Sequence, residues 1–395
     1  MSAGAITRSI WVLSLVSLFT DMASDMLYPV MPAYLRSIGF SVAFIGLLEG
    51  IAEAAAGLSK GYFGYWSDMS GKRLPFVRLG YTLSALSKPL MAAMAYPLWI
   101  FLVRTLDRLG KGMRTGARDA ILADASTDGN RGKVFGFHRS MDTVGAALGP
   151  ALALIWLYFR PGDYIPLFFI AFLPGIISVL LLFTLKEQNN LAPQGKTITF
   201  SDSMRWLKTA TPAYRTLLWG LLLFASINSA EIFLLLRAKD LGMSDAGVVG
   251  LYIFYNLIFA LLAYPLGRLS DTMGMKRIFL LGLALFAITY LGMALLSSTT
   301  AIIALFFVYG GFAAATDGLA KAWISKVCGP REKAVGLGTF AGLQSLSLLL
   351  ASVWAGLLWD IAGPMTVFLL TAGLSIPVGL YILLKVKEID LTEKP

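Results

Sequence analysis

Two residue types that build metal sites and disulfides are nearly absent from this sequence of 395 residues. It holds one cysteine, Cys328, and one histidine, His138. One cysteine excludes an intrachain disulfide and a cysteine-cluster metal site, and one histidine excludes a multi-histidine site. The sequence also lacks a Ser/His/Asp set and a phosphate loop. We therefore expect no metal and no enzyme activity.

Charged residues are scarce, at 14%, whereas 57% of the chain is hydrophobic and its mean hydropathy is +0.72. The apolar residues form runs of roughly 20, the length of a helix that crosses a bilayer. The first run is too long for a signal-peptide core and has no clear cleavage site, so we interpret it as a retained helix. The sequence predicts an all-α integral membrane protein with twelve transmembrane helices, near residues 8–36, 42–67, 74–96, 97–122, 131–158, 163–186, 211–238, 243–270, 276–297, 299–325, 333–360 and 363–386.

The basic residues predict the orientation of these helices, because Lys and Arg accumulate in cytoplasmic loops. We predict that the protein lies in the cytoplasmic membrane with both termini in the cytoplasm. Few basic residues then fall on the outer side of the membrane: Arg36, Arg160, Arg237 and Lys239. The net charge of +10 is then mostly a topology signal. No soluble basic stripe interleaved with aromatics is present, so we expect no nucleic-acid partner. The expected partners are a small-molecule substrate and the lipid bilayer, with the protein a monomer.

The longest polar stretch divides the chain into two groups of six helices. We predict an N-terminal bundle over residues 1–186, a cytoplasmic linker over 187–210, and a C-terminal bundle with a short cytoplasmic tail over 211–395. The later part of the linker, which includes Trp206, is apolar enough to lie along the inner membrane face.

The two groups also match each other in sequence. The stretch "GYWSDMSGKR" (64–73) is repeated as "GRLSDTMGMKR" (267–277), which pairs Asp68 with Asp271 and Gly71 with Gly274. "TGARDAILAD" (115–124) likewise matches "DGLAKAWISK" (317–326) at almost the same offset. We infer an internal duplication, which transporter folds commonly show.

These motifs resemble those of the major facilitator superfamily. The repeated loop is similar to the family's signature between helices 2 and 3, with Met69 where a basic residue is usual. "RTLDRLG" (104–110) is similar to the helix-4 signature, with Arg104 at the position tied to proton coupling, although Asp107 and Arg108 stand where Gln and Gly are common. "GAALGP" resembles the helix-5 signature of antiporter-type exporters, with Gly145, Gly149 and Pro150. The resemblance implies two six-helix halves around a midplane site, and protons as the coupling ion without a cofactor.

The paired loops are predicted to act as a gate at the inner face. The glycines allow a tight turn, and Asp68 can accept hydrogen bonds from the N-terminal amides of a neighbouring helix. Lys72 and Arg73 can pair with Asp119 or Asp124. The alternative is a turn that only anchors the topology. The predicted gate residues are Gly64, Asp68, Gly71, Lys72, Arg73, Asp119, Asp124, Gly267, Asp271, Gly274, Lys276 and Arg277.

Charges within the predicted spans are costly, and they usually mark function. Asp21 and Asp25 lie four residues apart on one helical face, and Glu49 and Glu53 repeat that spacing on the next helix. The predicted proton-coupling residues are Asp21, Asp25, Glu49, Glu53, Arg104, Asp107, Arg108 and Asp142, with Asp25 and Glu53 the first candidates. The alternative for each acid is a static ion pair. Lys88 is interpreted as a structural pair, and His138 as structural or part of a gate.

At the duplicated positions the second half has neutral polar residues, so we assign much of the hydrogen bonding to substrate there. The candidate substrate residues are Asn228, Ser229, Glu231, Tyr252, Tyr255, Asn256, Gln344 and Trp354. The sequence predicts a secondary transporter that works by alternating access, a proton antiporter that exports a small drug-like molecule or metabolite. One alternative is proton-coupled import of a polar metabolite or siderophore. Another is a transporter-like membrane sensor or scaffold.

Overall fold

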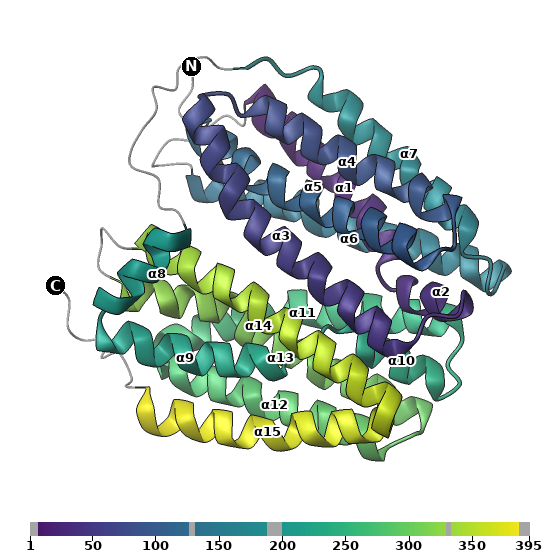
Figure 1. Cartoon of the computed structure of the whole chain (residues 1–395), viewed down its shortest axis with the longest axis vertical. Coiled ribbons are helices and arrows are strands. Elements are labelled where there is room, and N and C mark those ends of the chain that lie inside the picture. The colour runs from purple at the N-terminus through teal and green to yellow at the C-terminus, as the bar shows by residue number, and fades with distance from the viewer. Residues whose placement is uncertain (1–6, 126–130, 188–199, 329–332, 387–395) are drawn as a thin grey trace. The chain divides into compact units, whose positions relative to one another are not determined.

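A computed structural model describes residues 7–125, 131–187, 200–328 and 333–386, and its regular elements there are all α-helices (Figure 1). The first seven are α1 (Arg8–Leu27), α2 (Met31–Ser37), α3 (Val42–Ser70), α4 (Leu74–Ala93), α5 (Pro97–Asp124), α6 (Arg131–Phe159) and α7 (Ile165–Leu182). The others are α8 (Phe200–Thr209), α9 (Pro212–Ile227), α10 (Ile232–Asp240), α11 (Asp245–Met273), α12 (Met275–Leu295), α13 (Thr299–Val327), α14 (Lys333–Ala362) and α15 (Pro364–Lys385).

Several of these helices begin where a hydroxyl side chain satisfies a free backbone N–H. Thr7 accepts from the N–H of Ile10 at the start of α1, and Thr211 accepts from that of Tyr214 at the start of α9. Ser298 begins α13 in the same way. Such caps are typical of helix N-termini, where the first N–H groups have no partner within the helix.

Most of the helices have the length and apolarity of membrane spans. Ten stretches of the described chain meet both criteria, with α9 and α10 counted together. The helices α4 and α5 are not among them, and they carry Lys88, Arg104, Asp107 and Arg108. The all-helical membrane fold is confirmed, whereas the count of twelve spans stays a prediction.

The described chain forms two compact units, whose segments fall within residues 1–40, 51–197 and 244–250 for the first and 41–50, 198–243 and 251–395 for the second. In the first unit α1 packs against α6 and α7, and α4 packs against α5 and α7. Its apolar core joins α1 to α4 and α7 through Leu13, Val77 and Leu182. The start of α11 belongs to this unit, where the Tyr164 hydroxyl donates to Asp245. Burial, and then the Asp245 carboxylate, raise the pKa of Tyr164 above its usual range.

The second unit has an aromatic core. Phe224 of α9 contacts Phe286 of α12 and Phe312 of α13 with ring centroids 5.2 and 5.9 Å apart. Figure 1 shows α15 alongside α12, in agreement with their packing. The first residues of α3 also belong to this unit, where Asp360 of α14 accepts from the backbone N–H of Val42 (3.1 Å) and Ala43 (2.8 Å). The predicted domain boundaries are not tested by this division and stay predictions.

The two units bury different kinds of residue. Apart from Glu49, every buried charged side chain in the described ranges belongs to the first unit, among them Lys88, Arg104, Asp107 and His138. Burial of a charge is costly unless it is paired or put to use. The first unit is therefore where ion chemistry is expected.

Candidate functional site

The repeated loops turn at their second glycine. Gly71 and Gly274 have φ of 63° and 94°, a region that favours glycine. The first glycines of the loops, Gly64 and Gly267, have nothing within 4 Å of the position that a Cβ would take. The side chains of Asp68 and Asp271 lie outside the described residues, so their part in a gate stays a prediction, as do the roles of Lys276 and Arg277.

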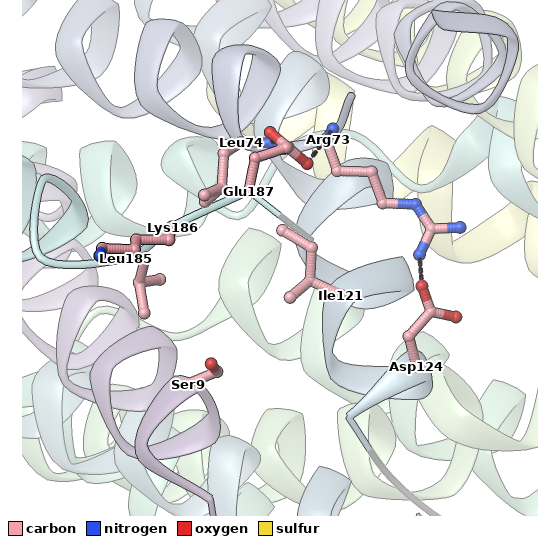
Figure 2. Close-up of a pocket in the computed structure, with 8 residues that line it drawn as sticks. All are labelled: Ser9, Arg73, Leu74, Ile121, Asp124, Leu185, Lys186 and Glu187. Atoms are coloured by element: carbon pink, nitrogen blue, oxygen red, sulfur yellow. Dashed lines mark hydrogen bonds and ion pairs between the residues drawn. The ribbon is translucent and has the colours of Figure 1, made fainter. Parts of the chain in front are cut away.

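At the inner end of the first unit, Arg73 forms an ion pair with Asp124 (Figure 2). Glu187, which follows α7, accepts from the backbone N–H of Arg73 at 3.0 Å and of Leu74 at 2.9 Å, and so caps α4. Arg73 and Asp124 were one of the pairings that the sequence suggested. Glu187 was not foreseen, because a cap from 113 residues away leaves no local pattern.

The other predicted gate residues of this half behave differently. Asp119 accepts from Arg118, the residue before it, at 2.8 Å rather than from Lys72 or Arg73. Lys72 is exposed, and its backbone N–H donates to Ser70. Among the residues that the structure describes, the inner end thus has a long-range ion pair that joins the N-cap residue of α4 to the last residue of α5.

Deeper in the first unit, Lys88 of α4 and Asp107 of α5 form a buried ion pair. Lys88 Nζ lies 2.9 Å from Asp107 Oδ1, and the two side chains are 5% and 9% exposed. Ser87 also donates to Asp107 Oδ1, and Arg104 Nη1 lies 3.7 Å from Asp107 Oδ2. This geometry fits the structural role expected for Lys88. The same ion pair gives the carboxylate of Asp107 a cation partner.

The acids of α3 lie in different surroundings. Glu53 Oε1 is 3.3 Å from Nη2 of Arg108 on α5, and that guanidinium is 5.9 Å from the ring centroid of Tyr28. Glu49, one turn earlier, is 1% exposed and belongs to the second unit. Glu53 therefore has Arg108 as its cation in this structure. Glu49 and Glu53, which were predicted to share one helical face, belong to different units.

The acids of α1 have no such cation. Neither Asp21 nor Asp25 forms an ion pair or hydrogen bond with another described residue. Asp25 interacts electrostatically with Asp21, and Asp21 with Asp142 of α6. The basic residue Lys111 of α5 acts on both aspartates of α1. Three carboxylates that repel one another thus lie along α1 and α6.

Two glycines bring α6 into backbone contact with α1. A Cβ on Gly145 would collide with the carbonyl oxygen of Leu18, and one on Gly149 with that of Met22. Pro150 lies inside α6 directly after Gly149. Close packing explains the two glycines, and the exporter role that the motif implies stays a prediction.

In the second unit the chain leaves the helical path between α9 and α10, over residues 228–231. Glu231 at this break accepts a hydrogen bond from the hydroxyl of Tyr255. The ring of Tyr255 lies 5.4 Å from that of Tyr252 and 5.3 Å from that of Tyr309. A carboxylate and three phenol rings therefore share one cluster, and Tyr309 is a member that the sequence analysis missed.

The remaining candidate substrate residues lie at the same break, on α11 and on α14. The Asn228 side-chain oxygen is buried without a hydrogen-bond partner among the described residues, and Ser229 is buried. Trp354 Nε1 donates to the carbonyl of Ser226 at 2.9 Å. Asn256 donates to the carbonyl of Tyr252, four residues earlier, and Gln344 on α14 is half-buried. Their contact with a substrate stays a prediction.

Within the described ranges no three His, Cys, Asp or Glu side chains are placed to hold a metal ion together.

Comparison with known proteins identifies the class. The fold is shared with a solved structure of the nucleoside transporter NupG, which superposes with a TM-score of 0.81 at 15% identity, covering 95% of this chain and 98% of that one. The family model of the Major Facilitator Superfamily matches residues 13–260 and 232–395. The chain belongs to this superfamily.

Two relatives illustrate the range of similarity. An uncharacterised MFS-type transporter of Methanocaldococcus jannaschii, MJ1317, is 33% identical over 384 residues, which are 96% of this chain and 95% of that one. A multi-drug resistance efflux pump, the PmrA homologue of Lactococcus lactis, is 23% identical over 82% of this chain and 81% of its own. The protein is a multi-pass membrane transporter of small molecules and not an enzyme, and its family works without a cofactor.

Proposed function

We propose that the protein is a proton antiporter that exports a small organic molecule across the cytoplasmic membrane, with both termini in the cytoplasm. The observation that carries the proposal is the state of the two acids of α1. Neither Asp21 nor Asp25 forms an ion pair with another residue that the structure describes, whereas Glu53 and Asp107 are paired with Arg108 and Lys88. An acid with a fixed cation keeps its charge, but one without a partner is free to gain and lose a proton during the cycle.

The electrostatic neighbours of Asp21 and Asp25 support this role. Lys111 interacts electrostatically with both acids, other basic residues of the first unit interact with one or the other, and Asp142 interacts with Asp21. A change in the distance to any of these charges during alternating access would change the proton affinity of the acid. One proton that enters the cell contributes about 2.3 kcal/mol for each 100 mV of membrane potential.

The substrate is assigned to the second unit, at the break between α9 and α10. The cluster of Glu231, Tyr252, Tyr255 and Tyr309 combines a carboxylate with large aromatic faces. Aromatic faces and a few placed polar groups suit a small amphipathic molecule. Export is favoured by the PmrA homologue and by the distant quinolone resistance protein NorA of Staphylococcus aureus.

The test is proton movement in everted vesicles, in which the purified protein has its cytoplasmic face outward. The vesicle lumen is acidified, a lumenal pH dye is followed, and ethidium or a quinolone is added outside. Antiport predicts that the lumen becomes less acidic as the compound enters, and that Asp25→Asn abolishes the signal. The Asp163→Asn variant, altered in a loop after α6, serves as the control and should behave as wild type.

Two outcomes would replace the proposal. Proton-linked accumulation of a polar metabolite such as a nucleoside in right-side-out vesicles, with no response in everted ones, would establish the import alternative. A wild-type signal from a protein in which Asp21, Asp25, Glu49 and Glu53 are all neutralised would remove the acids from the mechanism.

A further inference from the structure

The histidine of the chain lies beside the column of carboxylates, in the half of α6 that is predicted to face the cytoplasm. His138 is 4% exposed. Its Nδ1 and the hydroxyl of Ser14 on α1 share a hydrogen bond of 3.3 Å. Its Nε2 lies 3.6 Å from Oδ1 of Asp142, one turn along α6. The imidazole thus bridges a carboxylate of α6 and a hydroxyl of α1.

Two atoms of this bridge are unsatisfied. Both His138 Nε2 and Asp142 Oδ1 are buried and have no hydrogen-bond partner among the described residues. Buried polar atoms are nearly always paired, so an exception calls for an explanation. At 3.6 Å the two atoms face each other just beyond hydrogen-bond length. A proton placed between them would draw them to the 2.7–2.9 Å typical of charge-assisted hydrogen bonds.

Helix geometry places the other members in line with this pair. Ser14, Asp21 and Asp25 recur on α1 at intervals of seven and four residues, which keeps them on one face. Gly145 and Gly149 hold α6 against that helix, next to Leu18 and Met22. Asp142 interacts electrostatically with Asp21. The resulting order along the two helices is Asp25, Asp21, Asp142, His138 and Ser14.

We propose that His138 is a proton-relay residue that carries the coupling proton between the acids of α1 and the inner end of the first unit. This inference rests on the proposed proton antiport. In one transfer the O–H bond of protonated Asp142 breaks and an N–H bond forms at Nε2. The ring then releases the proton that it carried at Nδ1 to Ser14 Oγ, while the Ser14 hydroxyl passes its own proton to a water molecule at the inner end of the first unit, so that no electron is gained or lost. A neutral imidazole can accept at one nitrogen and donate from the other.

Charged groups of both signs face the ring: Asp142 and Asp119 are acidic, and Arg118 and Arg139 are basic. Arg118 itself is held by Asp119 at 2.8 Å and by Ser17 at 3.1 Å. Each ring nitrogen faces a group that can exchange a proton, Asp142 at Nε2 and Ser14 at Nδ1.

The test compares net proton transport with exchange that moves no net proton. In vesicles with a lumenal pH dye, His138→Gln should slow proton movement driven by ethidium or a quinolone at least tenfold. Exchange of labelled against unlabelled compound at equal pH should keep its rate, which also shows that the variant is folded. Thr143→Val is altered beside Asp142, at a hydroxyl that donates to the Arg139 carbonyl, and it should match wild type in both measurements. Coupled transport at the wild-type rate in His138→Gln would overturn the relay.

A second measurement uses the unmodified protein and stands if the variant does not fold. Because the sequence has a single histidine, ¹⁵N-histidine labelling reports on one imidazole. The relay predicts that its ring N–H exchanges with D₂O faster than one transport cycle, whereas a ring proton that persists through many cycles would refute it. If wild type itself moves no protons with either compound, the antiport proposal fails. If wild type couples and His138→Gln couples equally fast, only the relay fails.

Discussion

Lys88 Nζ and Asp107 Oδ1 lie 2.9 Å apart, with both side chains at least nine-tenths buried between α4 and α5. Removal of one partner of such a pair leaves an uncompensated charge, at a cost of about 3–5 kcal/mol. Lys88→Met should therefore lower the unfolding temperature in detergent sharply. The double variant Lys88→Met/Asp107→Leu should recover most of the loss. A double variant as unstable as the single one would contradict this pairing.

The cap on α4 gives a second prediction. Glu187 satisfies two backbone N–H groups at the start of that helix, and loss of a helix cap costs about 0.5–2 kcal/mol. Glu187→Ala should lower the unfolding temperature, measured by differential scanning fluorimetry. Lys186 and Glu187 both line the pocket shown in Figure 2. Lys186→Ala removes a charge next to Glu187 without touching the cap and should have little effect.

Replacement by alanine should affect stability differently at two glycines, because Gly149 lies at the α1–α6 contact and Gly373 does not. Gly149→Ala places a methyl group against the backbone of Met22, and overpacking of this kind costs about 1–3 kcal/mol. Gly373→Ala on α15 has nothing within 4 Å of the new carbon and should be neutral or gain up to about 1 kcal/mol in helix propensity. Thermal unfolding of the two variants decides the matter, and equal stability would argue against the close packing.

The start of α3 offers a local test. Asp360 accepts from the N–H groups of Val42 and Ala43, and a cap of this kind shifts a helix-end equilibrium about 2- to 30-fold. In Asp360→Ala, hydrogen–deuterium exchange of the peptide that covers residues 41–50 should speed up within that range. Asp163→Ala should leave it unchanged. Unchanged exchange in Asp360→Ala would show that the carboxylate does not hold the helix end.

The sequence predicted most of the fold because apolar runs, basic loops and a duplication each act over short or regular distances. It also pointed to the loop glycines with positive φ, and the pairings that it offered for Lys72 and Arg73 included that of Arg73 with Asp124. The coupling role that it assigned to the acids of α1 stays a prediction. Periodicity placed Glu49 and Glu53 on one face, but it did not reveal that one is buried in the second unit and the other meets Arg108.

The missed features depend on contacts between distant residues. Glu187 reaches α4 from beyond α7, Tyr309 joins Tyr255 from α13, and Ser14 meets His138 from α1. None of these residues belongs to a motif, and each is an ordinary residue in its own segment. Without the packing of the helices, their roles leave no local pattern to find.

The backbone contact at Gly145 and Gly149 has a mechanical consequence. Helices separated by long side chains can slide or rotate past each other when those side chains change rotamer, but helices in contact at their carbonyls cannot. If Asp25 or Asp21 carries the coupling proton as proposed, the change in its charge would therefore move α1 and α6 together as one body rather than rotate α1 alone.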